Sequence, residues 1–348
     1  MSKKQIKAID FFCGSGGMTY GMHKAGIHVL AGLDIDESCR ETYEHNNKYS
    51  KFIAADIKNL TFEELEKETG ITKNDENLLF IGCSPCQYWS IIRTKRDKAS
   101  ETKNLLGDFK KFADYFKPGY IVIENVPGIR SKRNESGVES FLKFLRDNEY
   151  YYDCDILNAY EYGVPQTRKR FVLIASRLKD IKLPPKTNNK KVNVGDFIGV
   201  HNGFPKVKAG NRDDTSFLHT VAGLEDKNKK RLSITPKNGG TRASWAIDEE
   251  LQIETYKKHT GFYDVYGRMH WDKPAPTITT KFFSLSNGRF GHPDELRAIS
   301  LREGATLQTF PKTYKFKLNS IAGNARLIGN AVPPILAEAI GKQILEKN

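Results

Sequence analysis

Long apolar runs, a cysteine framework and an excess of acidic residues are all missing from this chain of 348 residues. No apolar stretch approaches the roughly 18 residues that cross a bilayer, and Met1–Gln5 lead into a strand-like run without an apolar leader. Five cysteines, an odd and sparse number for this length, argue against a disulfide scaffold and for a reducing compartment. We therefore expect a cytoplasmic protein without membrane segments.

Acidic residues are outnumbered: 55 lysines and arginines against 42 aspartates and glutamates leave a formal charge of +13. Such a balance favours an anionic partner, although a generically basic protein has the same composition. Hydrophobic residues make up 39% of the chain and aromatic residues 11%, which is enough for a packed core.

What the chain does contain, up to about Ser176, is a regular alternation of short apolar runs with amphipathic segments. This alternation predicts a doubly wound α/β fold with a mixed, mostly parallel sheet. The expected strands are Lys7–Phe12, His28–Leu33, Lys51–Ala54, Leu78–Ile81, Tyr120–Ile123, Asp155–Asn158 and Arg170–Ile174, and the clearest expected helices are Leu105–Phe116, Val138–Asp147 and Pro334–Leu345.

The composition changes at about Arg177, where Asn, Lys, Gly and Pro become frequent and periodicity fades. The stretch still carries aromatic residues such as Phe204, Trp245 and Tyr266, so we expect an irregular folded domain and not a disordered tail. The predicted organisation is a domain over residues 1–176 followed by a smaller domain over residues 177–320, and no internal repeat is visible.

Two polar side chains follow two of the expected strands. Cys86 stands in GCSPCQYWS after Leu78–Ile81, and Glu124 stands in ENVPG after Tyr120–Ile123. Because ligands bind at the carboxyl ends of the strands in open α/β sheets, both side chains are expected to face one cavity. A thiol and an acid in one pocket suggest covalent attack on an electrophilic ring or carbonyl, with the acid managing a proton.

A glycine-rich loop follows the first expected strand, in the sequence Asp10–Gly17. Asp34 lies 20 positions after Gly14 (34 − 14 = 20), where nucleotide-binding folds place an acid on a ribose hydroxyl. A tight turn with an unrelated surface acid has the same pattern. The loop lacks the full G-x-G-x-x-G spacing, which disfavours NAD, and Asp56 is a third acid that can contact an adenine amino group.

Cys83 and Cys86 also form a C-x-x-C pair, which is typical of a redox dithiol or half of a zinc site. No second Cys or His pair supplies the missing ligands, so no metal is expected. A redox module would also leave Glu124 and the glycine loop unexplained.

Taken together, these segments resemble the DNA cytosine-5 methyltransferase family. Six stretches match its motifs in order: Phe12–Gly17, Pro85–Gln87, Glu124–Val126, Gln166–Arg170, Pro276–Thr280 and Gly329–Val332. The unmatched region from about Ser176 to Tyr266 corresponds to the family's variable target-recognition region, and residues 268–280 carry a family-type segment within the second domain. Two departures are Asp34, where the family usually has Glu, and Ile35, which is often aromatic in relatives.

The resemblance implies a mechanism and a fold, that of S-adenosylmethionine-dependent methyltransferases. Cys86, as thiolate, is expected to add to carbon 6 of cytosine so that carbon 5 accepts the methyl group. Glu124 is expected at ring nitrogen 3, and Arg168 at the base oxygen, orienting Glu124. Arg170 is expected to support the pocket, while a solvated basic turn is the plainer interpretation of this segment.

S-adenosyl-L-methionine is the implied cofactor. Residues 321–348 are then a segment that packs back on the first domain. The implied cofactor contacts are Phe12, Gly14, Gly16, Asp34, Asp56, Pro85, Leu105, Asn330 and Val332.

The implied substrate is duplex DNA, from which the target base must be flipped out of the stack. The basic segment Ser90–Lys98 is expected to be a mobile lid, with Arg93, Lys95 and Arg96 near phosphates; an ordinary exposed loop is the alternative. In the recognition region, Arg242 is the expected DNA contact.

The implied setting is a restriction–modification system, in which the protein acts as a monomer without a protein partner and a cognate restriction endonuclease acts independently. Methylation of cytosine in tRNA is the alternative activity, and a catalytically silent DNA-binding paralogue is the alternative without one. The long basic region before Pro276 favours DNA, and intact Cys86, Glu124 and Arg168 argue against the silent paralogue.

Overall fold

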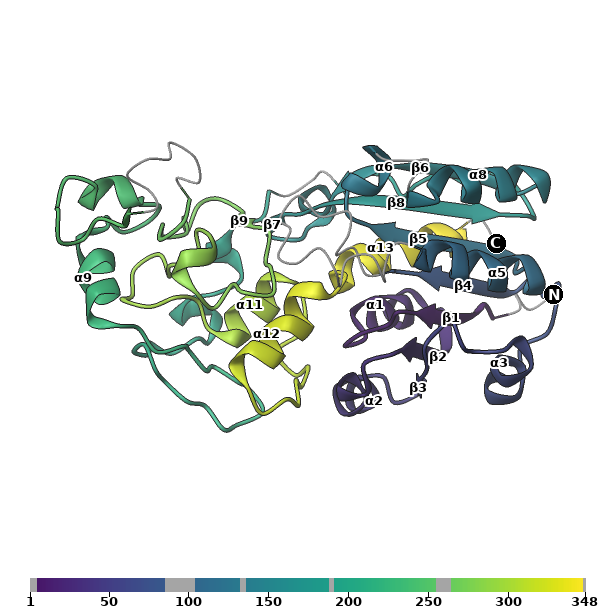
Figure 1. Ribbon diagram of the computed structural model, residues 1–348, viewed down its shortest axis with the longest axis horizontal. Coiled ribbons are helices and arrows are strands. Elements are labelled where there is room, and N and C mark those ends of the chain that lie inside the picture. Colours follow the sequence, from purple (N-terminus) through teal and green to yellow (C-terminus); the bar gives the residue numbers. More distant parts are fainter. Residues whose placement is uncertain (1–4, 85–103, 132–135, 188–190, 255–263, 347–348) are drawn as a thin grey trace. The chain divides into compact units, whose positions relative to one another are not determined.

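The computed structural model describes residues 5–84, 104–131, 136–187, 191–254 and 264–346, which divide into two compact units (Figure 1). The first unit combines Met1–Tyr162, Lys169–Lys186 and Pro334–Asn348. The second combines Gly163–Arg168 and Thr187–Pro333. No described helix combines the length and the apolar character that a membrane crossing requires.

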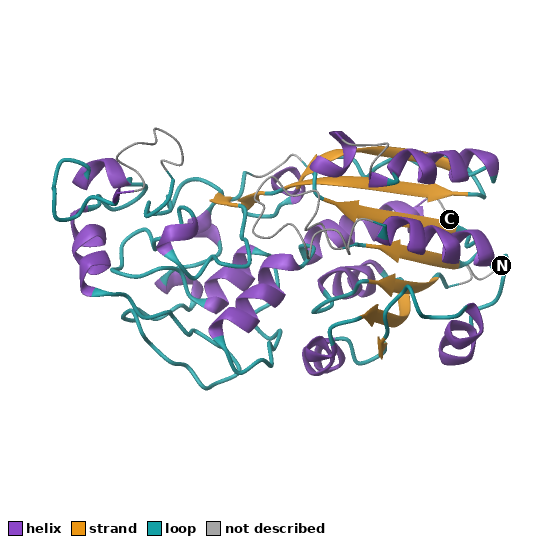
Figure 2. Cartoon of the chain, viewed as in Figure 1, coloured by secondary structure: helices purple, strands orange, loops and turns teal. Residues whose placement is uncertain are grey.

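A single sheet organises the first unit (Figure 2). Within the described residues it has seven strands in the order β3-β2-β1-β4-β5-β8-β6. The first five strands along the chain run parallel, and β8 runs antiparallel to both β5 and β6. The prediction of a mixed, mostly parallel sheet is therefore confirmed. The strands are β1 (Lys7–Phe11), β2 (His28–Asp34), β3 (Lys51–Ala54), β4 (Leu78–Gly82), β5 (Tyr120–Asn125), β6 (Tyr151–Asn158) and β8 (Lys169–Ser176).

One face of this sheet is covered by α3 (Phe62–Thr69), α5 (Leu105–Phe116) and α8 (Val138–Asp147). Phe11 of β1 packs between Phe80 and Phe109, with ring centroids 5.1 and 5.2 Å away. Each buried phenylalanine contributes about 1.5–3 kcal/mol of transfer free energy. α5 ends where Lys117 adopts a left-handed conformation just before Pro118, which cannot continue a helix.

Helix α13 (Pro334–Glu346) packs closely on α1 (Gly17–Ala25), and both belong to the first unit. A Cβ added at Gly21 would lie 2.4 Å from both the Ala337 Cβ and the Pro334 carbonyl oxygen, so only glycine permits this approach. The remaining short elements of this unit are η1 (Glu37–Cys39), α2 (Arg40–Asn46), α6 (Gly128–Ser131) and η2 (Ala159–Tyr162).

The second unit has little regular structure. Its described elements are β7 (Gln166–Thr167) paired in parallel with β9 (Ala275–Pro276), the helices α9 (Asp226–Ile234), α11 (Leu301–Leu307) and α12 (Ile321–Asn330), and the turns η3 (Val194–Asp196), η4 (Val200–Asn202), η5 (Arg242–Trp245) and η6 (Leu285–Asn287). Buried carbonyl groups outside helices and strands still need donors.

Buried arginines supply many of those donors. Arg268 donates to the carbonyl oxygens of Leu232, Thr235, His292 and Glu295, at 2.7–3.1 Å. Arg302 donates to four more carbonyls, including that of Tyr314 at 2.8 Å, and burial lowers its pKa to about 10. Loops far apart in the sequence are therefore held together by guanidinium groups.

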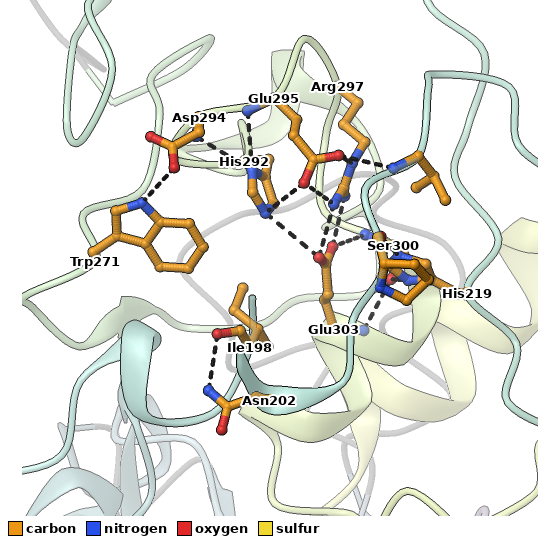
Figure 3. Close-up of polar contacts among 12 residues, drawn as sticks. Ile198, Asn202, His219, Trp271, His292, Asp294, Glu295, Arg297, Ser300 and Glu303 are labelled. Atoms are coloured by element: carbon orange, nitrogen blue, oxygen red, sulfur yellow. Dashed lines mark hydrogen bonds and ion pairs between the residues drawn. The ribbon is translucent and has the colours of Figure 1, made fainter. Parts of the chain in front are cut away.

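A largely buried charged cluster lies in the same unit (Figure 3). Arg297 donates to both carboxylate oxygens of Glu303, at 2.7 and 2.9 Å, and also pairs with Glu295. His292 Nδ1 accepts from the backbone amides of Asp294 and Glu295, so Nε2 carries the proton of the neutral ring. That Nε2 lies 3.4 Å from Glu295 Oε1 and 3.6 Å from Glu303 Oε1. Ser300 caps α11 by accepting from the Glu303 amide.

The division into units differs from the expected boundaries at residues 176 and 320. The first unit continues to Lys186, and α12 belongs to the second unit, which extends to Pro333. Residues 163–168 also belong to the second unit, because β7 pairs with β9 there. Composition could not reveal this, since the pairing joins segments more than 100 positions apart.

Candidate active site

The glycine loop after β1 has an unusual backbone. Phe12, Gly14 and Gly16 have positive φ values of 63°, 50° and 87°, and Gly16 precedes the first residue of α1. Glycine adopts this conformation without strain. The Cys13 amide donates to the Leu33 carbonyl at 2.9 Å, which fixes the loop against the end of β2.

Asp34, the last residue of β2, holds the loop from the other side. One carboxylate oxygen accepts from the Gly14 amide and the other from the Asp36 amide, each at 2.9 Å. A Cβ added at Gly14 would meet no atom of the described residues within 4 Å, so that part of the chain leaves open space beside this backbone. The loop therefore offers a cradle at the start of a helix, with an acid beside it.

The other expected cofactor residues are spread along the chain. Leu105 is the buried first residue of α5, and Asp56 accepts from the Lys58 amide at 3.0 Å. Ile35, beside Asp34, is 69% exposed. Asn330 ends α12 and Val332 is buried, both in the second unit just before α13 begins. Pro85 lies outside the described residues.

Beneath the loop lies a buried acid that the sequence did not single out as functional. Asp10 accepts a 2.6 Å hydrogen bond from the Thr19 hydroxyl, which lies 3.1 Å from the Tyr43 hydroxyl. Burial, with the nearby Asp34 charge, raises the pKa of Asp10 to about 7. Its other oxygen, Oδ1, has no hydrogen-bond partner in the described chain. Burial also raises the pKa of Cys13 well above its usual value, so that thiol is unsuited to nucleophilic attack.

Hydrogen bonds join the carboxyl ends of β4 and β5, as expected for neighbouring strands that contribute to one ligand site. Asn125 Nδ2 donates to the Ser84 carbonyl at 3.2 Å and to its hydroxyl at 3.1 Å. Glu124 is the neighbour of Asn125 at the end of β5, and Ser84 precedes Cys86 by two positions in the sequence. Cys86 itself lies outside the described residues, as do Arg93, Lys95 and Arg96.

The ion pair with Glu124 is made by Arg170, a contact we had expected from Arg168. Arg170 Nε lies 2.9 Å from Glu124 Oε1, and both side chains are largely shielded from solvent. The N–H of this pair is not aligned as a hydrogen bond, so Glu124 Oε1 accepts no hydrogen bond from the described residues. The register explains the pairing: Glu124 lies opposite Val172 on antiparallel β8, which makes Arg170 its diagonal neighbour on the same face.

Arg168 is held within the second unit. Its Nη1 donates to the Ile278 carbonyl at 3.0 Å, and its Nη2 to the carbonyls of Gly329 and Ala331 at 3.1 Å. Gln166, two positions earlier, accepts from the Ile278 amide and donates to Gln308. In the Gln166–Arg170 segment, Gln166 and Arg168 therefore make hydrogen bonds within the second unit, whereas Arg170 pairs with Glu124 of the first unit.

Arg242, the expected DNA contact, is 8% exposed. A guanidinium that is this buried is poorly placed to reach a phosphate. The sequence could not distinguish it from the exposed basic residues around it.

A family model for C-5 cytosine-specific DNA methylases matches residues 6–346. The chain belongs to this family. This enzyme therefore catalyses the family's reaction, which is the methylation of carbon 5 of cytosine in DNA with S-adenosylmethionine as the methyl donor. Membership favours this activity over the tRNA-directed and the silent alternatives.

Individual relatives support the assignment to the C-5 cytosine-specific methylases. Type II methylase M.HgiDII of Herpetosiphon aurantiacus is 38% identical over 97% of this chain and 94% of its own. Type II methyltransferase M1.HphI of Haemophilus parahaemolyticus is 30% identical over 98% of this chain and 87% of its own. Among solved structures, a protein encoded within an E. coli prophage has a TM-score of 0.74 at 23% identity, covering 98% of this chain and 99% of its own. The Dnmt2 methyltransferase of S. pombe has a TM-score of 0.64 at 19% identity, covering 99% of each chain. These two structures share the fold.

The described loop fits the family's cofactor. Open space beside Gly14 leaves room for a ligand against the backbone, and Asp34 places a carboxylate next to it. A carboxylate is a suitable acceptor for ribose hydroxyls.

Proposed function

We propose that this methylase forms a transient bond between Cys86 Sγ and carbon 6 of a cytosine flipped out of duplex DNA. The hydrogen bonds from Asn125 to Ser84 carry the proposal, because they join the end of β5, with Glu124, to the residues that lead to Cys86. A base inside the stack could not present carbon 6 to a side chain.

The chemistry assigned to Cys86 follows from the ring. Addition of the thiolate to carbon 6 forms the S–C bond and moves an electron pair towards carbon 5, which becomes nucleophilic. When bound, S-adenosylmethionine supplies the electrophilic methyl group. Loss of the carbon 5 proton to a base then returns an electron pair to the ring and expels the thiolate. Sulfur suits this role because it is strongly nucleophilic even when only partly ionised.

Glu124 and Arg170 are assigned to the base. Glu124 would face ring nitrogen 3 and donate a proton or hydrogen bond as electron density builds there. Arg170, at 2.9 Å from Glu124, would hold that carboxyl in place and lie near the base oxygen. Arg168 would also be needed for the reaction, as a positioning residue that holds three carbonyl groups of the second unit.

A duplex containing 5-fluorocytosine tests this assignment. In the presence of S-adenosylmethionine, methyl transfer leaves fluorine in place of the carbon 5 proton, so elimination is blocked and the bond from Cys86 to carbon 6 should persist and survive denaturing electrophoresis. We expect a covalent complex with the wild type and none with Cys86→Ser. Cys83→Ser, three positions upstream, is the matched control and should still form it. A covalent complex with Cys86→Ser would contradict the proposal. Normal binding of S-adenosylmethionine by this variant is the check that it is folded.

The biological setting is proposed from the relatives, which are named type II methylases. We infer that the protein is the modification enzyme of a restriction–modification system and methylates cytosine in one specific duplex sequence. It would act in the cytoplasm as a monomer, with a cognate endonuclease acting independently. Bisulfite sequencing of DNA from expressing cells tests this: cytosines should be methylated in one sequence context, and methylation without a common context would contradict it.

A further inference from the structure

A pocket of about 260 Å³ lies between the C-terminal half of α1 and the end of α2, and none of its lining residues is assigned to the reaction. Tyr20, His23 and Lys24 line it from α1, and Lys48 and Tyr49 line it from the turn after α2. The glycine loop is at the opposite end of α1, so this is a separate site within the first unit.

The lining of the pocket is mainly apolar, and the charged groups that border it are positive. Lys24 and Lys48 are exposed, and neither ammonium group pairs with a carboxylate in the described chain. No acidic residue is among the described residues that line the pocket. Burial lowers the pKa of His23, so its imidazole is neutral and the two unpaired cations are what favours an anion, a phosphate group in particular.

Aromatic rings flank these cations. The Tyr49 side chain is 80% exposed, an unusual exposure for an aromatic residue beside a pocket. Lys24 Nζ lies 5.8 Å from the centre of the Tyr20 ring. Basic groups beside aromatic faces are the combination with which proteins bind single nucleotides, because every base can stack on a ring.

A hydrogen bond to Ser50 fixes the orientation of the His23 imidazole. Ser50 donates its hydroxyl proton to the Val29 carbonyl at 2.7 Å, so its oxygen accepts from His23 Nε2 at 2.8 Å. The pocket therefore has a fixed polar group between its two flexible lysines.

We propose that this pocket binds a nucleoside monophosphate unit, with the base against Tyr49 and the phosphate between Lys24 and Lys48. The unit can come from a free nucleotide or from one strand of DNA. The proposal goes beyond the methylation reaction and does not depend on Cys86.

Titration calorimetry with thymidine 5′-monophosphate tests the free nucleotide, with the cofactor site saturated by S-adenosylhomocysteine. Thymidine cannot substitute for the target cytosine, so binding reports on this pocket. We expect a dissociation constant on the order of 0.1–1 mM, with thymidine and inorganic phosphate each binding more weakly. Tyr49→Ala, Lys24→Ala and Lys48→Ala should each weaken binding at least about 5-fold, a change of about 1 kcal/mol or more. Lys67→Ala on α3, an exposed lysine remote from this pocket in the sequence, is the matched control.

A cytosine-free A·T duplex tests the DNA strand as the source. If the strand occupies the pocket, the double variant Lys24→Ala/Lys48→Ala should reduce the slope of log affinity against log salt by about 0.9, the contribution of the one phosphate that the two lysines share. An unchanged slope together with nucleotide binding identifies the free nucleotide as the ligand. No nucleotide binding and an unchanged slope would overturn the proposal.

Discussion

Arg170 and Glu124 form the ion pair at the end of β5, with Arg170 Nε 2.9 Å from Glu124 Oε1. Arg168, two positions earlier, is held by three carbonyls of the other unit. The segment Arg168–Arg170 therefore makes contacts in both units: Arg170 pairs with a carboxylate of the first unit, and Arg168 binds carbonyl groups of the second.

Replacing Arg170 by alanine should lower the methylation rate on the order of 10- to 100-fold, because it would leave the shielded Glu124 carboxylate without its cation, at a cost of about 1–3 kcal/mol. Single-turnover methylation of a substrate duplex measures the effect, and the affinity for S-adenosylmethionine should not change. Arg146→Ala, whose ion pair with Glu139 is exposed, should retain the wild-type rate. A wild-type rate in Arg170→Ala would remove this residue from the site.

Asp10→Asn should stabilise the protein increasingly as the pH rises. The pKa of Asp10 is raised to about 7 in the fold from an ordinary value of 3.8, so the folded state binds the extra proton between these values. The wild type therefore loses stability as pH rises through this window, by up to about 1.4 kcal/mol per pH unit from this group. Asparagine can still accept from Thr19 and carries no charge. Urea unfolding of both proteins at pH 4 to 8 measures the difference, and parallel stability curves would contradict the assignment.

His292→Gln should reduce the loss of stability in acid. Burial lowers the pKa of His292 to about 4, so the fold favours the neutral ring. This contribution is fully present above about pH 6.5 and is lost as the pH falls towards 4. The pKa of Glu303, lowered to about 2 by Arg297, adds a second loss as pH falls from about 4.5 to 2. Since Asp10 titrates in the opposite sense, the difference between variant and wild type in urea unfolding is the informative quantity. A difference that does not vary between pH 4 and 6.5 would contradict the prediction.

Gly21→Ala should destabilise the first unit by about 1–3 kcal/mol, because the new methyl group would lie 2.4 Å from the Pro334 carbonyl of α13. The affinity for S-adenosylmethionine should fall with it, since Asn330 and Val332 immediately precede α13. Thermal unfolding and cofactor titration measure the two effects. Gly107→Ala on α5, where a Cβ meets no described atom within 4 Å, is the control and should be neutral or slightly stabilising. Equal stability of the two variants would contradict the close packing of α1 and α13.

Neutralising Arg93, Lys95 and Arg96 together should weaken DNA binding and reduce its salt slope by about 2.7, at about 0.9 for each phosphate contact. Fluorescence anisotropy over a range of salt concentrations measures the slope. An unchanged slope would mean that this segment makes no phosphate contacts. Affinity for S-adenosylmethionine serves as the check on folding.

Local features of the first unit were predictable from the sequence. Leu78–Gly82 is buried at every position, and such a strand reads as a continuous apolar run. Helix α5 spans Leu105–Phe116, as the helical spacing of its phenylalanines predicts, and it ends just before Pro118. These signals are local, so no knowledge of the tertiary structure was needed.

Partners of the arginines were not predictable in the same way. Arg168 meets carbonyls 110 to 163 positions away, and the burial of Arg242 depends on the packing of an irregular domain. The pairing of Arg170 with Glu124 required the register of β5 against β8, which no local pattern specifies. Charge and motif identify such residues as important, but only the fold distinguishes a residue that meets the substrate from one that anchors a loop.

The chain passes between the two units four times, at residues 162/163, 168/169, 186/187 and 333/334. The second unit is consequently not a single exchangeable cassette. A chimera designed to acquire a relative's sequence preference by transplanting residues 187–333 alone would keep the host's Gly163–Arg168, and its β7, Gln166 and Arg168 would then meet foreign partners. Grafts that carry both pieces from the same donor should fold, whereas grafts of the longer piece alone should be insoluble or inactive.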